Sequence, residues 1–269
     1  MKNFSAKAPT RRLTALAVAV AVTIGLSVAP NTSPAFAAET RVGLGTAESF
    51  AVLAGQTVTN TDTPTKISGN VGVSPGSAVT GFPPGLVNPG TTYKADDVAA
   101  RAKADLTIAF DDAARRTPVE TGIIDLTGRQ LVSGVYSGGA LALTGTVTLV
   151  GDASSVFIFQ AASTLITGSG SRVALQGPIN PCNVFWQVGS SATINSGSQF
   201  VGTVLALETI SAKSGATVNG RLLARNGEVT LDANVITVPS DCVGSTPLVD
   251  NTAVAPPAVP VPRRATFTG

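Results

Sequence analysis

The stretch VFWQVGSSATINSGSQFVGTVLALETISAKSGATVNGRLLAR, residues 184–225, decides the fold. Three short apolar segments begin in it at Val184, Thr203 and Arg221, and the last two starts lie 18 residues apart. Glycine, serine and asparagine separate the segments. A repeat of this length, made of short strands with small polar corners, is typical of a β-solenoid, whose stacked coils bury a side that a single coil cannot bury alone.

Each coil contains three segments of different character. The first is apolar at consecutive positions, as in Phe157-Ile158-Phe159 and Leu222-Leu223, and a strand that is apolar on both sides must be covered on both sides. The second alternates, as in Ala192-Thr193-Ile194-Asn195, so one of its sides meets solvent. The third is mixed. We therefore expect a mostly β fold with a triangular cross-section, one side of which is sealed by another element.

Residues 93–116 are the best candidate for the sealing element. Their apolar residues recur at helical spacing, acids stand near the start, and Arg115, Arg116 and Pro118 mark the end. A helix of this length spans roughly 34 Å, and about six stacked coils span roughly 29 Å. The helix can therefore run along the solenoid. Residues 50–60 resemble one more coil, separated from the others by the helix and by a Pro/Gly-rich stretch, residues 75–90.

Composition excludes several classes of site. The chain has no histidine, only two cysteines, and 13% charged residues. It therefore lacks the residues for a Ser-His-Asp triad or a His-ligated metal, and two cysteines alone cannot complete a zinc site. We expect no metal, no cofactor and no enzymatic activity. If residues 1–37 are cleaved as a leader, four of the 18 basic residues are lost and 14 remain against 16 acidic residues. The net charge therefore gives no argument for a nucleic-acid partner.

The two ends of the chain differ from its middle. Residues 1–37 combine a basic start, an apolar run from Leu13 to Val28 and Ala35-Phe36-Ala37, the pattern of a signal peptide, which implies secretion to the outside or to the cell surface. Residues 38–242 form the predicted domain. Residues 243–269 are rich in proline and are interpreted as an extended tail, which is either free or joins the domain to a cell wall or envelope. Export favours a disulfide between Cys182 and Cys242 over two free thiols.

Several segments together resemble the ice-binding-like (antifreeze-like) family of bacteria and fungi. They cover roughly residues 43–238 and include Gly69-Asn70-Val71-Gly72-Val73-Ser74-Pro75-Gly76, Val184-Phe185-Trp186-Gln187-Val188-Gly189, and Leu223-Ala224-Arg225-Asn226-Gly227-Glu228. The resemblance implies a right-handed solenoid with a long helix alongside. It also implies a chain that lays down one coil, returns along the helix and builds the remaining coils back toward the first. The implied partner is the surface of an ice crystal. The oligomeric state is left open by the sequence, with a monomer as the default expectation.

The alternating strands supply the candidate binding surface. Outward threonines offer a methyl group and a hydroxyl on a stiff side chain, which together can order water on a flat face. The candidate ice-binding residues are Thr57, Thr59, Thr146, Thr148, Thr167, Thr193, Asn195, Thr209, Ser211 and Thr230. Threonine is also common on any exposed strand, so a surface or adhesion module without ice activity is the alternative. Glu208, Glu228 and Asp232 form no evident carboxylate pair for polysaccharide cleavage.

Three further groups of residues have structural interpretations. Trp186 is predicted to lie in the core under the helix rather than to form a sugar platform. Acidic residues at positions 96, 97, 111 and 112 are predicted to form a solvated helix face rather than a metal site. Isolated surface or edge charges are predicted for Arg172, Arg221 and Arg225.

Overall fold

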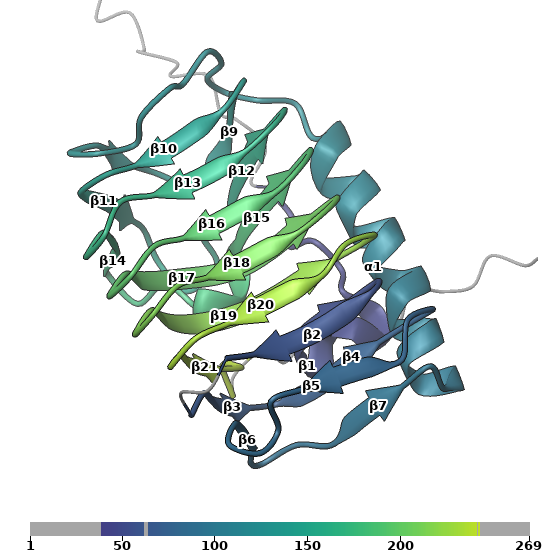
Figure 1. The fold of residues 1–269 in the computed structure, drawn as a ribbon. Helices are drawn as coiled ribbons and strands as arrows, with labels where there is room; N and C mark the ends of the chain where they lie inside the picture. The colour runs from purple at the N-terminus through teal and green to yellow at the C-terminus, as the bar shows by residue number, and fades with distance from the viewer. Residues whose placement is uncertain (1–38, 62–63, 241, 243–269) are drawn as a thin grey trace, which may run out of the picture. The chain divides into compact units, whose positions relative to one another are not determined.

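The computed structural model describes residues 39–61, 64–240 and 242, so the predicted leader and tail lie outside the described residues. The described part is a β-solenoid of parallel strands with one long helix running along it, as the sequence predicts (Figure 1). One complete passage of the chain, here called a coil, crosses three sides, which we name face a, face b and face c.

Face a lies beneath the helix. Its neighbouring strands pair in parallel, and their order across the face is β9 (Gly134–Gly138), β12 (Phe157–Ala161), β15 (Val184–Val188), β17 (Gln199–Ala206), β19 (Thr217–Ala224), β1 (Phe50–Ala54), β4 (Asn70–Val73) and β7 (Thr92–Lys94).

Face b is a separate sheet of seven parallel strands. Their order is β10 (Leu141–Leu143), β13 (Leu165–Thr167), β16 (Ala192–Ile194), β18 (Ile210–Ala212), β20 (Val229–Leu231), β2 (Thr57–Asn60) and β5 (Ala78–Thr80).

Face c continues directly from face a, because the long strands β17 and β19 belong to both faces. Its order is β8 (Gln130–Leu131), β11 (Thr146–Val150), β14 (Arg172–Gln176), β17, β19, β21 (Val235–Thr237), β3 (Lys66–Ser68) and β6 (Leu86–Val87).

The chain closes the solenoid in the middle of the stack. Strands β1 to β7 are laid down first, the helix follows, and β8 to β21 then stack back toward the start, so that β19, β20 and β21 pair with β1, β2 and β3. The N-terminal part holds two complete coils rather than the one expected, because residues 75–90 contribute β5 and β6 instead of a mere connection. This extra coil is why face b has seven strands where about six coils were expected.

Helix α1 (Asp97–Arg115) seals face a, as predicted. Its buried residues are Ala99, Ala102, Leu106, Ala109, Phe110 and Ala113, the stripe that the spacing indicates. The helix begins four residues later than expected because residues 92–94 form β7 and the side chain of Asp96 caps the first turn by accepting the backbone N–H of Ala99 at 2.8 Å. At its other end, Gln160 donates to the carbonyl oxygens of Ala113 and Arg116, each at 2.8 Å.

The strands of face a divide their apolar side chains between two cores. One set points outward against α1 and includes Phe50, Ile158, Phe185, Leu205 and Leu223. The other set points into the solenoid. Burial of each large apolar side chain stabilises the fold by about 1.5–3 kcal/mol. Because these strands are apolar on both sides, they are stable only when the helix covers one side and the solenoid interior covers the other.

Trp186 lies in the interior of the solenoid and not under the helix, which corrects our prediction of its side. Its neighbour Phe185 faces α1, and because side chains alternate along a strand, Trp186 must point the other way. The indole ring stacks on Phe159 at a centroid distance of 4.0 Å, and its Nε1 donates to the backbone oxygen of Val201 at 2.9 Å. A satisfied, fully buried indole is core, as expected.

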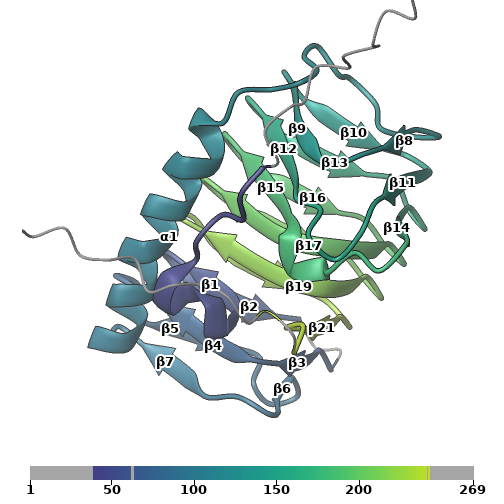
Figure 2. The same ribbon diagram turned by 180° about the vertical axis from the view of Figure 1, so that it is seen from behind.

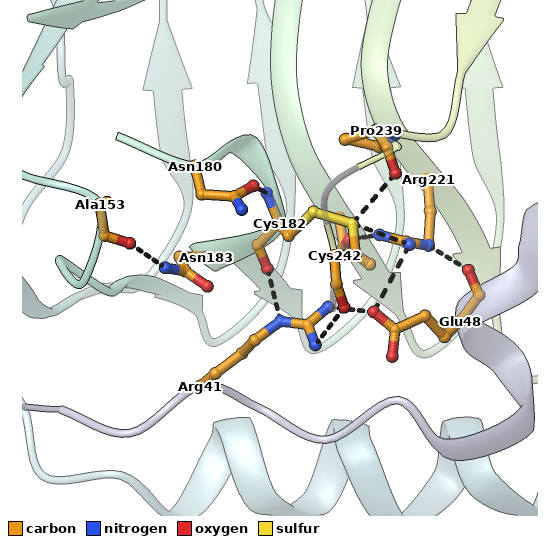
Figure 3. Close-up of a disulfide and its surroundings, with 10 residues drawn as sticks. Arg41, Glu48, Ala153, Asn180, Cys182, Asn183, Arg221, Pro239 and Cys242 are labelled. Carbon is orange, nitrogen blue, oxygen red and sulfur yellow. Dashed lines mark hydrogen bonds and ion pairs between the residues drawn. A yellow bond between two sulfur atoms is a disulfide. The ribbon is translucent and has the colours of Figure 1, made fainter. Parts of the chain in front are cut away.

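The structure joins Cys182 to Cys242 in a disulfide, with their Cα atoms 5.4 Å apart (Figure 3). Cys182 belongs to the short helix η2 (Pro181–Asn183), which immediately precedes β15; a second short helix, η1 (Gly45–Ser49), precedes β1. Within the described residues, no helix combines the length and the apolarity that crossing a membrane requires.

Candidate functional site

Face b is the side of the solenoid that carries the alternating strands. The strands are in register, so each contributes one outward side chain to a row that runs across the whole sheet. We call this the central row, and it consists of Ala142, Ile166, Thr193, Ser211, Thr230, Thr59 and Thr80. Adjacent members are separated by about 4.8 Å, the spacing of paired strands.

Two further rows flank the central row. Residues two positions earlier in each coil include Ser191, Thr209, Glu228 and Thr57, and residues two positions later include Asn195, Lys213, Asp232 and Thr61. All of them except Thr57 of β2 lie directly beside the end of a strand, two positions from a central-row residue, which is about 6.7 Å along an extended chain. Small polar side chains therefore cover most of face b, with isolated charges near its margins.

Seven of the ten predicted residues lie on or beside this surface. The central row holds Thr59, Thr193, Ser211 and Thr230, whereas Thr57, Thr209 and Asn195 belong to the flanking rows. The structure thus brings together residues from both ends of the domain, because Thr59 pairs with Thr230 where the two arms of the chain meet.

Thr146 and Thr148 do not belong to this surface. They lie on β11 in face c, where Thr146 pairs with Arg172 and Thr148 with Ala174. The face b strand of that coil is β10, whose outward residue is Ala142. The signal for the correct assignment was present in the sequence: Leu141-Ala142-Leu143 follows the apolar strand of its coil just as Ala192-Thr193-Ile194 follows Phe185-Trp186.

Thr167 also leaves the candidate surface, because its side chain points into the solenoid and is 1% exposed. Its Oγ1 accepts the backbone N–H of Asn195 at 2.9 Å and lies 3.1 Å from the hydroxyl of Ser198. A buried hydroxyl is tolerated where such partners satisfy it. The outward residue of β13 is Ile166, 49% exposed, which the sequence analysis missed because it placed Thr167 outward.

Hydrogen bonds tie several hydroxyls of face b to the next coil. Thr61 donates to Asp232 at 2.8 Å, Thr57 to Glu228 at 3.3 Å, and Thr80 to Thr59 at 3.4 Å. These bonds limit the rotation of side chains that β-branching already restricts. Glu228 and Asp232 thus bind threonines on the neighbouring strand, and they lie on either side of Thr230 rather than facing each other as an acid/base pair would.

Face c differs from face b in shape and charge. A hollow of about 430 Å³ lies over it, lined by residues that include Arg172, Gln199, Thr217, Asn219 and Thr237. Arg172 is exposed there, as predicted, and so is Lys66. A hollowed surface suits a planar crystal less well than an even ladder of short side chains, so face b is the better candidate for contact with a flat solid.

Two of the four predicted helix acids form ion pairs. Asp112 pairs with Arg116 at 2.9 Å, and Asp111 pairs with Arg225 at 3.2 Å, which makes Arg225 a partner of the helix rather than an isolated charge. In the described part of the chain, no three acidic or sulfur ligands come together in a group that could hold a metal ion.

Comparison with known proteins agrees with this architecture. Residues 52–237 match the model of the family described as "Ice-binding-like". The chain is 47% identical over 199 residues to an ice-binding protein of Nostoc sp. (strain HG1), with 72% of each chain covered. It is 33% identical over 213 residues to an ice-binding protein of Flavobacterium frigoris (strain PS1), covering 74% of this chain and 76% of that one.

Solved structures show the same fold. A crystal structure of an ice binding protein from an Antarctic biological consortium superposes with a TM-score of 0.74 at 42% identity, covering 78% of this chain and 96% of that one. The ice-binding protein of the Antarctic ascomycete Antarctomyces psychrotrophicus gives a TM-score of 0.69 at 40% identity and covers 74% and 98%. On the family match, the relatives and the shared parallel solenoid, the chain belongs to the Ice-binding-like family.

Proposed function

We propose that this protein is secreted, binds ice through face b as a monomer, and thereby inhibits ice growth or recrystallisation. The observation that carries the proposal is the central row, in which Thr193, Ser211, Thr230, Thr59 and Thr80 stand at successive strand spacings on a sheet that no described element covers. The relatives named ice-binding proteins support the same activity.

The physical basis is the ordering of water rather than catalysis. A threonine presents a methyl group, which favours a cage-like arrangement of water, and a hydroxyl, which can hydrogen-bond to that arrangement. The strands hold these groups at fixed spacing, and the β-branched side chains have few rotamers to lose on binding. Face b therefore offers ice a rigid template whose ordering cost is already met by folding.

Secretion is supported by the pattern of residues 1–37. Expression of the whole chain in an exporting host is expected to give a mature protein that begins at Ala38 or Glu39, as read by N-terminal sequencing. A mature protein that still begins at Met1 and stays inside the cell would contradict this part of the proposal.

The decisive experiment observes single ice crystals in dilute mature protein by nanolitre osmometry. The test variant is Thr193→Tyr/Thr230→Tyr, which places two bulky rings in the central row of face b. The matched control is Thr148→Tyr/Thr217→Tyr, which makes the same change on face c. Circular dichroism establishes that each variant is folded.

The expected result is that the wild type and the face c variant shape crystals and hold a hysteresis gap, whereas the face b variant does not. Activity that survives on the face b variant and fails on the face c variant would move the site to face c. Round, unshaped crystals in concentrated wild-type protein would overturn ice binding for this chain.

A further inference from the structure

The corner between faces a and c holds a cluster that the proposed function does not use. Here β17 and β19 bend at Gly202 and Gly220 as they pass from one face to the other. In a three-sided solenoid this corner lies opposite face b. In Figure 2, which shows the molecule from behind, η2 and the N-terminal segment pass close to β17 and β19.

Four segments that are distant in the chain meet at this corner (Figure 3). The disulfide connects η2 to Cys242. Arg221 of β19 has no exposed surface, donates Nε–H to the backbone oxygen of Glu48 at 2.8 Å, and brings Nη2 to 3.3 Å from the Sγ of Cys242. Arg41 donates to the backbone oxygen of Cys182 at 3.1 Å and pairs with Glu48.

The charges at this corner hold the segments together. Burial lowers the pKa of Arg221 to about 10, opposed by the nearby Glu48 carboxylate, so the guanidinium stays charged at neutral pH. A buried charge is tolerated only with an opposite charge and satisfied hydrogen bonds. Glu48 therefore ties the N-terminal segment to the same point at which the disulfide ties Cys242.

The disulfide determines where a pull on the C-terminal end of the domain would act. Without it, tension through residue 242 would act on β21, which pairs with β19 and with β3 over only three residues each and can peel away from its end. With it, tension passes to Cys182, directly before β15. That strand is buried throughout and pairs with β12 over five residues and with β17 over four.

We propose that this corner is a mechanical anchor, through which the domain holds ice on face b while the chain beyond residue 242 tethers it to a surface. The part that concerns ice rests on the proposed function. The sequence continues from residue 243 to residue 269 with Pro247, Pro256, Pro257, Pro260 and Pro262, a composition suited to a spacer. Ice and tether would then act on opposite sides of the solenoid.

The first test needs no ice. Optical tweezers pull the mature chain between a handle on residue 59 of face b and a handle on residue 269, comparing the wild type with Cys182→Ser/Cys242→Ser. The wild type is expected to rupture first at a higher force. The disulfide also prevents the residues between the two cysteines, whose sequence separation is 60, from being extended. At about 3.3–3.6 Å per residue, the variant should therefore extend by roughly 200 Å more than the wild type.

A control geometry separates anchoring from general stability. The same two proteins are pulled between residue 59 and residue 124, an exposed position whose connection to residue 59 does not pass through the bridge. Equal first-rupture forces are expected there. Equal forces in the C-terminal geometry, or the same difference in both geometries, would overturn the proposal. Reduction of the folded wild type in the tweezers repeats the comparison if the serine variant does not fold.

The second test uses ice. Beads that carry the mature chain through residue 269 are expected to stay on ice crystals under flow and to detach after reduction, whereas free reduced protein still shapes crystals. Beads that stay equally well after reduction would overturn the anchor. Free protein that never shapes crystals would overturn the proposed function instead, and would leave the tweezers result standing.

Discussion

Arg221 and Glu48 lie 173 residues apart in sequence and form a partly buried ion pair at 3.8 Å, supported by the bond from Arg221 Nε–H to the backbone oxygen of Glu48. The side chain of Arg221 is fully buried, and that of Glu48 is 17% exposed. The sequence predicted Arg221 to be an isolated edge charge, and this prediction was wrong. Its long side chain turns into the corner because a carboxylate from the N-terminal segment is there to meet it.

Removing the carboxylate should therefore cost more than removing an exposed charge. Glu48→Gln leaves Arg221 and Arg41 close together without their anion, and breaking such a pair typically costs about 3–5 kcal/mol. Urea denaturation with the disulfide intact measures the change. Arg172→Met, on the exposed surface of face c, is the control and should change stability by no more than about 0.5 kcal/mol. Equal effects of the two variants would contradict a role for the pair in stability.

Thr167 and Thr193 give a matched test of which hydroxyls of the face b strands are structural. Thr167→Val leaves the backbone N–H of Asn195 without its acceptor, whereas the hydroxyl of Ser198 keeps Ser171 and the backbone oxygen of Gly168 as partners. The variant should lower the free energy of unfolding by about 1–3 kcal/mol. Thr193→Val changes an outward hydroxyl and should cost less than about 0.5 kcal/mol. Thermal or urea unfolding distinguishes them, and a neutral Thr167→Val would show that its hydroxyl is dispensable.

Lys103 should make stability depend on pH in the alkaline range. Its Nζ donates to the backbone oxygens of Ala224 and Arg225 at the end of β19, and burial, assisted by the charge of Arg225, lowers its pKa from 10.5 to about 7. Between these values the unfolded chain binds a proton that the folded chain lacks, so this residue's contribution to stability rises as pH increases from about 7 to 10.5.

The variant Lys103→Met removes that titration. The difference in unfolding free energy between wild type and variant, followed by urea denaturation across this range, should move in favour of the wild type as pH rises. Lys66→Met removes the same charge at an exposed position on face c and serves as the control. A difference between wild type and Lys103→Met that stays constant from pH 7 to 10.5 would refute the shift.

Gly202 and Gly197 both have a positive φ, but they lie in different surroundings. At Gly197, with φ of +67°, a Cβ would meet no atom within 4 Å, so alanine should cost only the left-handed backbone penalty of about 1–2 kcal/mol. At Gly202, with φ of +110°, it would lie 2.6 Å from the backbone oxygen of Val184. Gly202→Ala should cost roughly 1–3 kcal/mol more, measured by calorimetry. Equal melting temperatures would contradict a tightly packed corner.

Local patterns were enough to predict the architecture and much of face b. The doubly apolar strands and the stripe of α1 follow from the spacing of apolar residues, because a side chain's burial in a helix or strand is largely set by its position in the period. The central positions Thr193, Ser211, Thr230 and Thr59 were found in the same way. The disulfide followed from two cysteines in a chain expected to be exported.

Only the tertiary structure decided the phase of the short strands and the corner opposite face b. A three-residue strand such as β13 can be read with either side outward, and pairing with Ala192 and Thr193 of the next coil places Leu165 inside and Ile166 outside. Likewise, no local signal shows that Arg221 is buried, because the carboxylate that makes burial possible arrives from a segment at the other end of the domain. The sequence alone determined the repeat and its sealed side, since both rest on local periodicity, whereas registers and buried charges depend on distant neighbours.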